Sequence, residues 1–334
     1  MSITINNSKY VSLTDREKEK AIKFIKDNFE AELASSLGLE RVSAPLFVSA
    51  KSGINDDLSG VERKVSFNLK DDKNELEVIQ SLAKWKRMAL SRYGYKTGEG
   101  LYTDMNAIRR DDKIDQIHSI YVDQWDWEKI ISNEDRSIEY LKNIVNKIVS
   151  VLVSISKRVN KEFPKLKPVI NPDVLFITGE ELLKKYPGID AKEREYKICK
   201  EYKTVFIIGI GHNLTNNEPH DLRAPDYDDW DLNGDLLVYD ETIDCALELS
   251  SMGIRVNEKS LASQLKLTGT LDRLEYPYHK MIIKKELPYT VGGGIGQSRI
   301  CLLLMQQFHI GQVQASYWPD DELKECEKKG IKLL

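Results

Sequence analysis

The sequence predicts a single α+β domain that occupies the whole chain, residues 1–334. Residues 14–37 and 134–163 repeat apolar side chains at helical spacing, whereas segments such as 121–127 alternate as strands do. Both kinds of segment are spread along the chain, with no repeat or linker between them. The composition, 41% hydrophobic and 31% charged, is ordinary for a globular protein large enough to bury a core.

The predicted elements of the first half follow from caps and breakers. Thr14 and Glu17 form a capping box before the helix that ends at Gly38. A strand-like piece at 39–47 contains Pro45, which places it at a sheet edge or a strand end. Next come a strand at 75–79, a helix capped by Ser81, a loop at 94–100, a strand at 121–127, and the helix 134–163 that Pro164 ends.

The second half is predicted from shorter segments. Buried strands are expected at 174–178 and 204–209, an acidic loop at 219–234, and short strands at 236–239 and 245–249. Helices are expected at 258–267 and 272–285. The last elements are a strand, a glycine-rich turn, a helix to Gln307 and a final strand at 312–317.

Charge, cysteine content and hydropathy restrict the class of protein. The net charge of -4 gives no basic excess for nucleic acid, so no nucleic-acid partner is expected. Four dispersed cysteines form no CxxC pair and indicate reduced thiols in a cytoplasmic protein. Apolar runs such as 205–210 are too short to cross a bilayer, and the N-terminus lacks the apolar core of a signal peptide. We therefore expect a soluble cytoplasmic protein without a membrane partner.

The segment GGGIGQSR at 292–299 is followed by an apolar helix. Glycines let backbone amides approach a ligand, a helix start attracts an anion, and Arg299 adds a permanent charge. A tight strand-to-helix turn with a surface arginine is an equally good interpretation.

The segment HSIYVDQWDWE at 118–128 follows Arg109 closely. Strand alternation puts Gln124, Asp126 and Glu128 on one face and the tryptophans on the other. Such polar groups are costly to bury without a partner, and the ammonium group of an amino acid is one such partner. A solvated outer face is the commoner alternative.

Two further segments are individually weak. ELSSMGIR at 248–255 sets a carboxylate and an arginine around small residues, which suits close approach of a ligand. QSLAKWKR at 80–87 places Lys86 near a helix start, where it can reach a carboxylate. An edge strand and a solvated helix face are the simpler alternatives.

Taken together and in order, these segments resemble the class II aminoacyl-tRNA synthetases. The helix and strand up to Pro45 resemble motif 1, the dimer-interface element; Arg109 with HSIYVDQWDWE resembles motif 2 of the aspartyl and asparaginyl subgroup; GGGIGQSR resembles motif 3. VDQWDWE, RAPDYDDW, ELSSMGIR and GGGIGQSR resemble the ammonia-dependent asparagine synthetases in particular. The resemblance, over residues 14–318, implies an antiparallel sheet flanked by helices, no anticodon-binding domain, and a homodimer.

The resemblance also implies a set of site residues. Those implied for ATP are Arg109 at the α-phosphate, Arg299 at the terminal phosphates, and Asp111, His118, Gly294 and Gly296. Asp235 and Glu248 are implied to hold magnesium. Those implied for L-aspartate are Gln124 and Asp126 at the ammonium group, Lys86 and Arg255 at the carboxylates, and Ser81 and Ser251 in the pocket wall. Asp111 and Tyr121 depart from the synthetase pattern, which has a longer Glu and an acidic residue there.

The implied reaction is ATP-dependent synthesis of L-asparagine from L-aspartate and free ammonia through a β-aspartyl adenylate, with release of AMP and pyrophosphate. Arg109, Arg299 and Lys86 are its expected catalytic side chains. Asp56 is a further candidate, as the ammonium site, although it also suits an Asx turn. The cysteines fit no glutaminase nucleophile turn, so free ammonia is the expected nitrogen source. The rival functions are a tRNA ligase or tRNA-modifying relative, and a non-catalytic paralogue that binds an amino acid or nucleotide.

Overall fold

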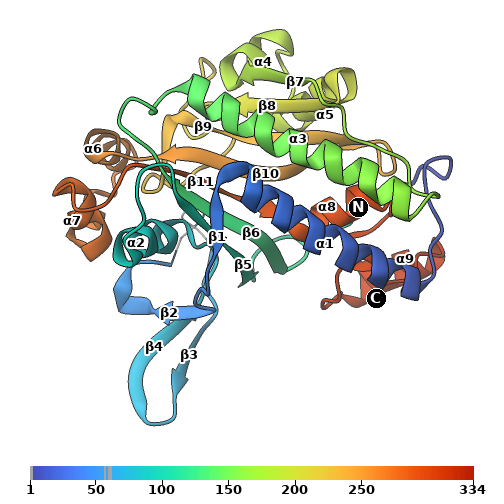
Figure 1. Cartoon of the computed structure of the whole chain (residues 1–334), viewed down its shortest axis with the longest axis horizontal. Coiled ribbons are helices and arrows are strands. Elements are labelled where there is room, and N and C mark those ends of the chain that lie inside the picture. Colours follow the sequence, from blue (N-terminus) through green and yellow to red (C-terminus); the bar gives the residue numbers. More distant parts are fainter. Residues whose placement is uncertain (1–2, 56–57, 59–61) are drawn as a thin grey trace.

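An eight-stranded sheet organises the structure, a computed structural model that describes residues 3–55, 58 and 62–334 (Figure 1). In spatial order its strands are β1 (Leu39–Arg41), β5 (Gly100–Ile108), β6 (Tyr121–Ile130), β11 (Thr290–Gly296), β10 (Cys245–Arg255), β9 (Asp228–Asp240), β8 (Thr204–Ile208) and β7 (Val174–Thr178). Neighbours from β5 to β8 are antiparallel, and a parallel pair closes each edge. The predicted α+β class with an antiparallel sheet is confirmed.

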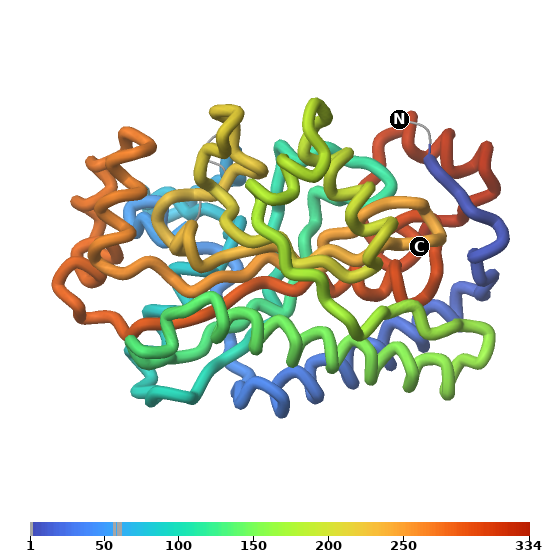
Figure 2. Tube along the Cα trace, turned by 90° about the horizontal axis from the view of Figure 1, so that it is seen from above, coloured from blue at the N-terminus to red at the C-terminus, as the bar shows by residue number. Residues whose placement is uncertain are grey.

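Two long helices, α1 (Asp15–Leu37) and α3 (Ile138–Glu162), lie side by side across one face of this sheet (Figure 2). Phe29 of α1 stacks on Trp125 of β6 with ring centroids 4.5 Å apart, and Trp127 is buried beside them. Burial of such aromatic and aliphatic surface is the main force that holds helices on a sheet. This face of the sheet is therefore the structural core, and the opposite face is left for a site.

The ends of α1 are as predicted. The Thr14 hydroxyl accepts a hydrogen bond from the Glu17 amide at 3.2 Å, and the Glu17 carboxylate accepts one from the Thr14 amide at 2.8 Å. Gly38 ends the helix in the left-handed region, with φ of 69°. The helical stripe behind this cap is buried, with Phe29 at its centre.

A second sheet of three strands projects from the body (Figure 1). It consists of β2 (Phe47–Ser49), β4 (Asp72–Val78) and β3 (Ser66–Leu69), with the 3-10 turn η1 (Ala50–Ser52) after β2. The single strand expected at 39–47 is therefore wrong: β1 and β2 belong to different sheets. Pro45 lies between them, where it has no ladder hydrogen bond to remove.

The helix α2 (Ala83–Tyr93) has Leu82 and not Ser81 at its N-cap, which corrects the prediction by one residue. The Ser81 hydroxyl still accepts from the Ala83 amide at 3.2 Å. The Ser81 oxygen thus satisfies one of the helix's first amide groups, which have no partner within the helix, from a position just before the N-cap.

The acidic loop expected at 219–234 is too long: residues 219–227 form no helix or strand, but β9 already begins at Asp228 and runs for 13 residues. The two short strands expected after it are parts of β9 and β10. The first half of β9 is mostly polar because its side chains have specific protein partners: Asp228 pairs with Arg255, Asp229 pairs with Arg136, and Asn233 bonds the backbone of Ile210.

Helices α4 (Gly179–Lys185), α5 (Ala191–Tyr202) and α6 (Glu258–Leu267) flank the β7–β9 and β10 regions. The bounds of α6 match the prediction. The helix expected at 272–285 is instead the 3-10 turn η2 (Leu271–Glu275) followed by α7 (Pro277–Ile283). Pro277 lacks an amide hydrogen, so the helix restarts there.

The C-terminal segment departs from prediction in two ways. The glycines at 292–296 lie within β11, and α8 (Gln297–Leu304) follows directly. The strand expected at 312–317 is wrong: the 3-10 turn η3 (Ile310–Gln312) and a segment without regular secondary structure lead to α9 (Asp320–Lys328). Packing of Trp318 on His309, 4.8 Å between ring centroids, holds this segment where strand pairing was expected.

Within the described part of the chain, none of the helices combines the length and hydrophobicity needed to cross a bilayer. All four cysteines are free thiols.

Candidate active site

Two adjoining cavities lie along the sheet near its centre. The first, of about 390 Å³, lies where β6 begins and β11 ends, and the second, of about 370 Å³, extends over the face opposite α1 and α3. Their shared lining residues are Arg109, Asp112, Gln124, Glu248 and Gly294. Together they form one continuous site with two compartments.

Alternation along β6 supplies the floor of the site, as predicted. Trp125 and Trp127 are fully buried towards α1, while Gln124 and Asp126 line the second cavity. Glu128, on the same face, is fully buried, so the solvated alternative is wrong.

The glycines of β11 make room for these side chains. A Cβ atom on Gly292 would fall on the Glu128 carboxylate, and one on Gly294 would fall on the Gln124 amide. Gly293 lies under β10, where a Cβ atom would come within 2.6 Å of Met252. The glycine run is thus required by close approach of neighbouring side chains, not by a turn.

Lys86 of α2 is fully buried and lines the second cavity, so it is not a solvated helix lysine. Its ammonium group is paired with the Asp126 carboxylate and donates to the carbonyl oxygen of Trp127 at 2.9 Å. A buried lysine needs such partners to remain charged.

Arg255 is held by two carboxylates. Its guanidinium donates twice to Glu128, at 2.9 and 2.7 Å, and once to Asp228 at 2.5 Å. Burial by itself would raise the pKa of Glu128, but Arg255 and then Lys86 hold that pKa below its usual value. Thr290 adds a hydrogen bond to Glu128 at 2.7 Å. The result is a fixed, charged lattice beneath the second cavity.

Arg223 is a site residue that the sequence reasoning did not single out. It donates to Asp235 at 2.5 Å and to the Ser251 hydroxyl. Burial raises the pKa of Asp235 to about 6; Arg223 opposes that rise, and the nearby Glu248 and Asp221 carboxylates add to it. The family-like phrase RAPDYDDW, which contains Arg223, was the available signal for this residue.

The first cavity contains both predicted phosphate arginines. Arg109 donates to the carbonyl oxygen of Gln80 at 3.3 and 3.4 Å, and Arg299 donates to the carbonyl oxygen of Glu248 at 2.8 Å. His118 also lines this cavity, and its Nδ1 lies 2.8 Å from an Asp115 oxygen.

Most of the predicted site residues are brought together. Those that line one cavity or both are Ser81, Lys86, Arg109, His118, Gln124, Asp126, Asp235, Glu248, Ser251, Arg255, Gly294, Gly296 and Arg299. Asp56 lies outside the described residues. Asp111 is not among the described lining residues; its carboxylate is paired with the exposed Arg63, which lowers its pKa to about 2. The neighbouring Asp112 lines both cavities instead.

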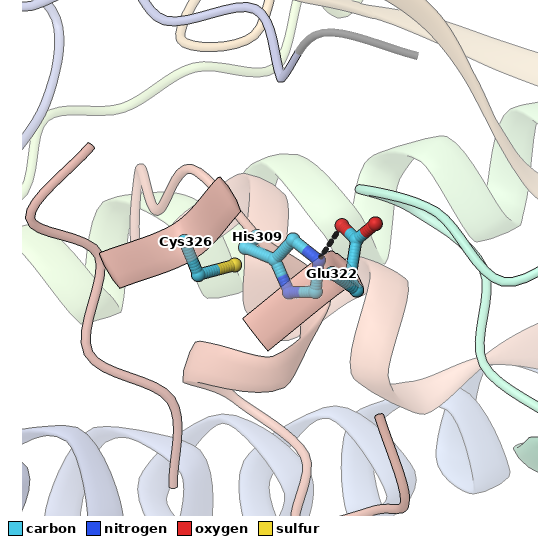
Figure 3. A group of neighbouring side chains, drawn as sticks. All are labelled: His309, Glu322 and Cys326. Atoms are coloured by element: carbon cyan, nitrogen blue, oxygen red, sulfur yellow. Dashed lines mark hydrogen bonds and ion pairs between the residues drawn. The ribbon is translucent and has the colours of Figure 1, made fainter. Parts of the chain in front are cut away.

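A separate group of potential metal ligands lies near the C-terminus, where His309, Glu322 and Cys326 approach one another (Figure 3). Both His309 ring nitrogens already have partners, Gly311 N at 2.9 Å and a Glu322 oxygen at 2.9 Å. Burial raises the pKa of the Cys326 thiol to about 11, so it is protonated at neutral pH. The group ties α9 to the body and does not line the two cavities.

Comparison with known proteins identifies the family. The family model described as aspartate-ammonia ligase matches residues 16–330. The chain is 55% identical over 323 residues to an aspartate–ammonia ligase of Clostridium perfringens, with 96% of each chain covered. The chain belongs to the aspartate–ammonia ligase family. A second relative with the same name, from Ligilactobacillus salivarius, is 54% identical over 324 residues, again with 96% of each chain covered.

As a member of the aspartate–ammonia ligase family, the chain is an enzyme of the ligase class. Its fold is shared with class II synthetases. Asparaginyl-tRNA synthetase of Entamoeba histolytica, solved with asparaginyl-adenylate, matches with a TM-score of 0.63 and 16% identity over 90% of this chain and 66% of that chain. The Pyrococcus horikoshii enzyme, also solved with asparaginyl-adenylate, matches with a TM-score of 0.63 and 14% identity over 90% of this chain and 70% of that chain. At this identity the likeness concerns the fold alone.

Proposed function

We propose that this ligase makes L-asparagine from L-aspartate and ammonia, using ATP to form a β-aspartyl adenylate and releasing AMP and pyrophosphate. The observation that carries the proposal is the pair of joined compartments. One contains Arg109 and Arg299, and the other contains the charged lattice around Lys86, Asp126 and Arg255. A nucleotide phosphate and a small zwitterionic dicarboxylate suit these two compartments.

The chemistry requires activation before ammonia can attack. A carboxylate offers ammonia only an oxide leaving group, whereas transfer of AMP to the β-carboxylate supplies a good one. In-line attack on the α-phosphorus needs positioning and neutralisation of charge. Arg109 lines both compartments, so its guanidinium suits the α-phosphate at the junction, with Arg299 towards the terminal phosphates. His118, Gly294 and Gly296 complete the nucleotide wall, and Asp112 replaces Asp111 as the nearby carboxylate.

The second compartment supports an orientation for aspartate. Gln124 and Asp126 accept the substrate ammonium group, and Lys86 or Arg255 contacts the α-carboxylate. Ser81 and Ser251 line the same space. This arrangement leaves the β-carboxylate directed to the junction where Arg109 lies.

The residues fit magnesium. Among the described residues that line the second cavity, seven carboxylates face four arginine or lysine side chains, so anionic ATP and aspartate need an added cation. Asp235 and Glu248 offer the hard oxygen ligands that magnesium prefers. Bound there, magnesium would neutralise phosphate charge, while Arg223 would give up its present bond to Asp235.

Three further features belong to the proposal. Asp56 is the proposed ammonium site, and Asp56→Asn should change the dependence of the rate on ammonia. The segment from Thr14 to Pro45, with α1 and β1, is the proposed homodimer interface of a single catalytic domain. The four free thiols suit work in the cytoplasm.

The test combines product analysis with isotope transfer. Aspartate labelled with ¹⁸O in its β-carboxylate is incubated with ATP, magnesium and ammonium. An adenylate intermediate transfers one ¹⁸O into AMP, which phosphorus NMR detects. ADP with label in inorganic phosphate would reject the adenylate, and charging of tRNA in the absence of ammonium would favour the synthetase rival. Absence of turnover would favour a non-catalytic protein.

A further inference from the structure

The helix that carries Arg299 cannot cap its own N-terminus. The N-cap of α8 is Gly296, which has no side chain to accept from the first amides. Asp123 takes this role from β6, which is far away in the sequence but pairs with β11 in the sheet. Its carboxylate accepts from the Ser298 amide at 3.1 Å and from the Ser298 hydroxyl at 2.8 Å. The first turn of α8 is thus bonded to the strand that forms the floor of the site.

Asp123 is buried and fully engaged. Lys26 of α1 donates to it at 2.9 Å and Gln314 donates at 3.3 Å. Its carboxylate lies at the positive end of the α8 dipole, where a negative charge is stabilised. The preceding residue of α8, Gln297, donates from its side-chain amide to Asp104 of β5 at 3.1 Å, which is a second tie between this turn and the sheet.

The bond to Ser298 bears directly on the next residue, Arg299. Arg299 lines the first cavity and is itself tethered to the carbonyl oxygen of Glu248 at 2.8 Å. With its backbone fixed by Asp123 and its guanidinium fixed by β10, the side chain has little freedom. The start of α8 is also occupied by a protein carboxylate, so side chains and not the helix dipole must supply the positive charge for a phosphate.

We propose that Asp123 is the positioning residue for Arg299: by capping α8 it sets the guanidinium in place for the terminal phosphates of ATP. This rests on the proposed function of the first cavity. Asp123 and Ser298 also line the first cavity, but the contacts that define the role of Asp123 are with protein groups: it holds the backbone and hydroxyl of Ser298, and through Ser298 it positions Arg299. Lys26 balances the buried charge, which links the α1 helix to the nucleotide compartment.

Three variants separate positioning from general stability. Asp123→Ala removes the cap and should raise the Kd and KM for ATP roughly 10- to 100-fold, the usual value of a hydrogen bond to a charged group, with KM for aspartate changed far less. Asp123→Asn keeps an oxygen for the Ser298 amide and should restore most of the ATP affinity. Lys26→Met removes the charge partner but leaves the cap, so it should lower the unfolding temperature without changing the Kd for ATP. Asp27→Ala, which removes an exposed carboxylate on α1, is the control for the general effect of replacing an aspartate by alanine.

A double-mutant cycle decides the mechanism. If Asp123 acts through Arg299, Asp123→Ala should have little further effect on ATP affinity in an Arg299→Ala background, measured by calorimetry with magnesium and ATP. An equal effect in both backgrounds, or an unchanged Kd for ATP in Asp123→Ala, would overturn the inference. Failure of the wild-type enzyme to make asparagine would instead reject the proposed function. The two outcomes are distinguishable, because the role of Asp123 is tested by the Kd for ATP and the proposed function by product formation.

Discussion

Replacement of Arg255 by methionine tests how much the buried charge lattice contributes to stability. Methionine keeps most of the length of the side chain but leaves Glu128 and Asp228 without their shared guanidinium. Both side chains are essentially inaccessible to solvent, with exposed fractions of 0% and 1%. Lys86 remains 3.7 Å from Glu128 but is already paired with Asp126.

The magnitude follows from burial. Removal of one partner of a buried ion pair costs about 3–5 kcal/mol, because a charge is left uncompensated. For 334 residues the unfolding entropy is about 0.7 kcal/mol per kelvin, so the unfolding midpoint should fall by roughly 4–7 °C. Arg63→Met is a matched control: Arg63 also makes a two-pronged contact with a carboxylate, Asp111, but its side chain is 70% exposed. Water screens an exposed ion pair, so the pair contributes little to stability and this variant should shift the midpoint by less than about 2 °C.

The assay is thermal unfolding by circular dichroism, supported by urea unfolding at low and high salt. High salt should abolish the small loss of stability in Arg63→Met, because salt screens exposed charges, but should leave the loss in Arg255→Met, where the charges are buried. The double variant Glu128→Gln, Arg255→Met should recover part of the loss, since one buried charge is gone. Equal shifts for Arg255→Met and Arg63→Met would refute the reasoning, because burial would then not set the cost.

Further predictions concern pH, metal and capping. Burial raises the pKa of Asp240 to about 7. The folded protein therefore keeps a proton that the unfolded chain releases near pH 4, so the free energy of unfolding falls as pH rises from about 4 to 7. Asp240→Asn should be more stable than wild type at pH 8, by up to about 4 kcal/mol, and little different at pH 4. Urea unfolding at the two pH values measures this difference. Asp235→Asn should weaken calorimetric binding of magnesium and ATP roughly tenfold or more; unchanged binding would remove Asp235 from the proposed metal site. Thr14→Ala should cost about 1 kcal/mol in urea unfolding through loss of the α1 cap, whereas Thr14→Ser should cost little.

The elements that sequence reasoning predicted well are those whose signals are local. The capping box of α1, its stop at Gly38, the bounds of α6 and the alternation of β6 all depend on residues a few positions apart. The first half of β9 was missed because residues 228–233 are mostly polar and resemble a loop, whereas Asp229 and Asn233 find their partners, Arg136 and the Ile210 backbone, only in the folded protein. The split at Pro277 is also encoded locally, since proline lacks the amide hydrogen that a continuous helix would need there.

For the site, ordered motifs were sufficient to collect most residues but not to show their partners. Arg223 and Asp112 were missed, and Asp111 was expected where Asp112 lies. Motif positions give the residue type at a location, whereas the direction of a side chain in a loop depends on what packs around it.

By itself, the sequence determined the α+β class, the family-like segments and most of the residues that line the two cavities, because local periodicity, caps and motif order are encoded within short stretches. Only the tertiary structure decided that Lys86 is paired with Asp126, that Arg255 is held by Glu128, and that glycines in β11 make room for β6 side chains. These contacts join residues 40 and 127 positions apart in the first two cases. The energy of a buried charge depends on the partner that the fold brings to it, and that partner cannot be read from neighbouring residues in the chain.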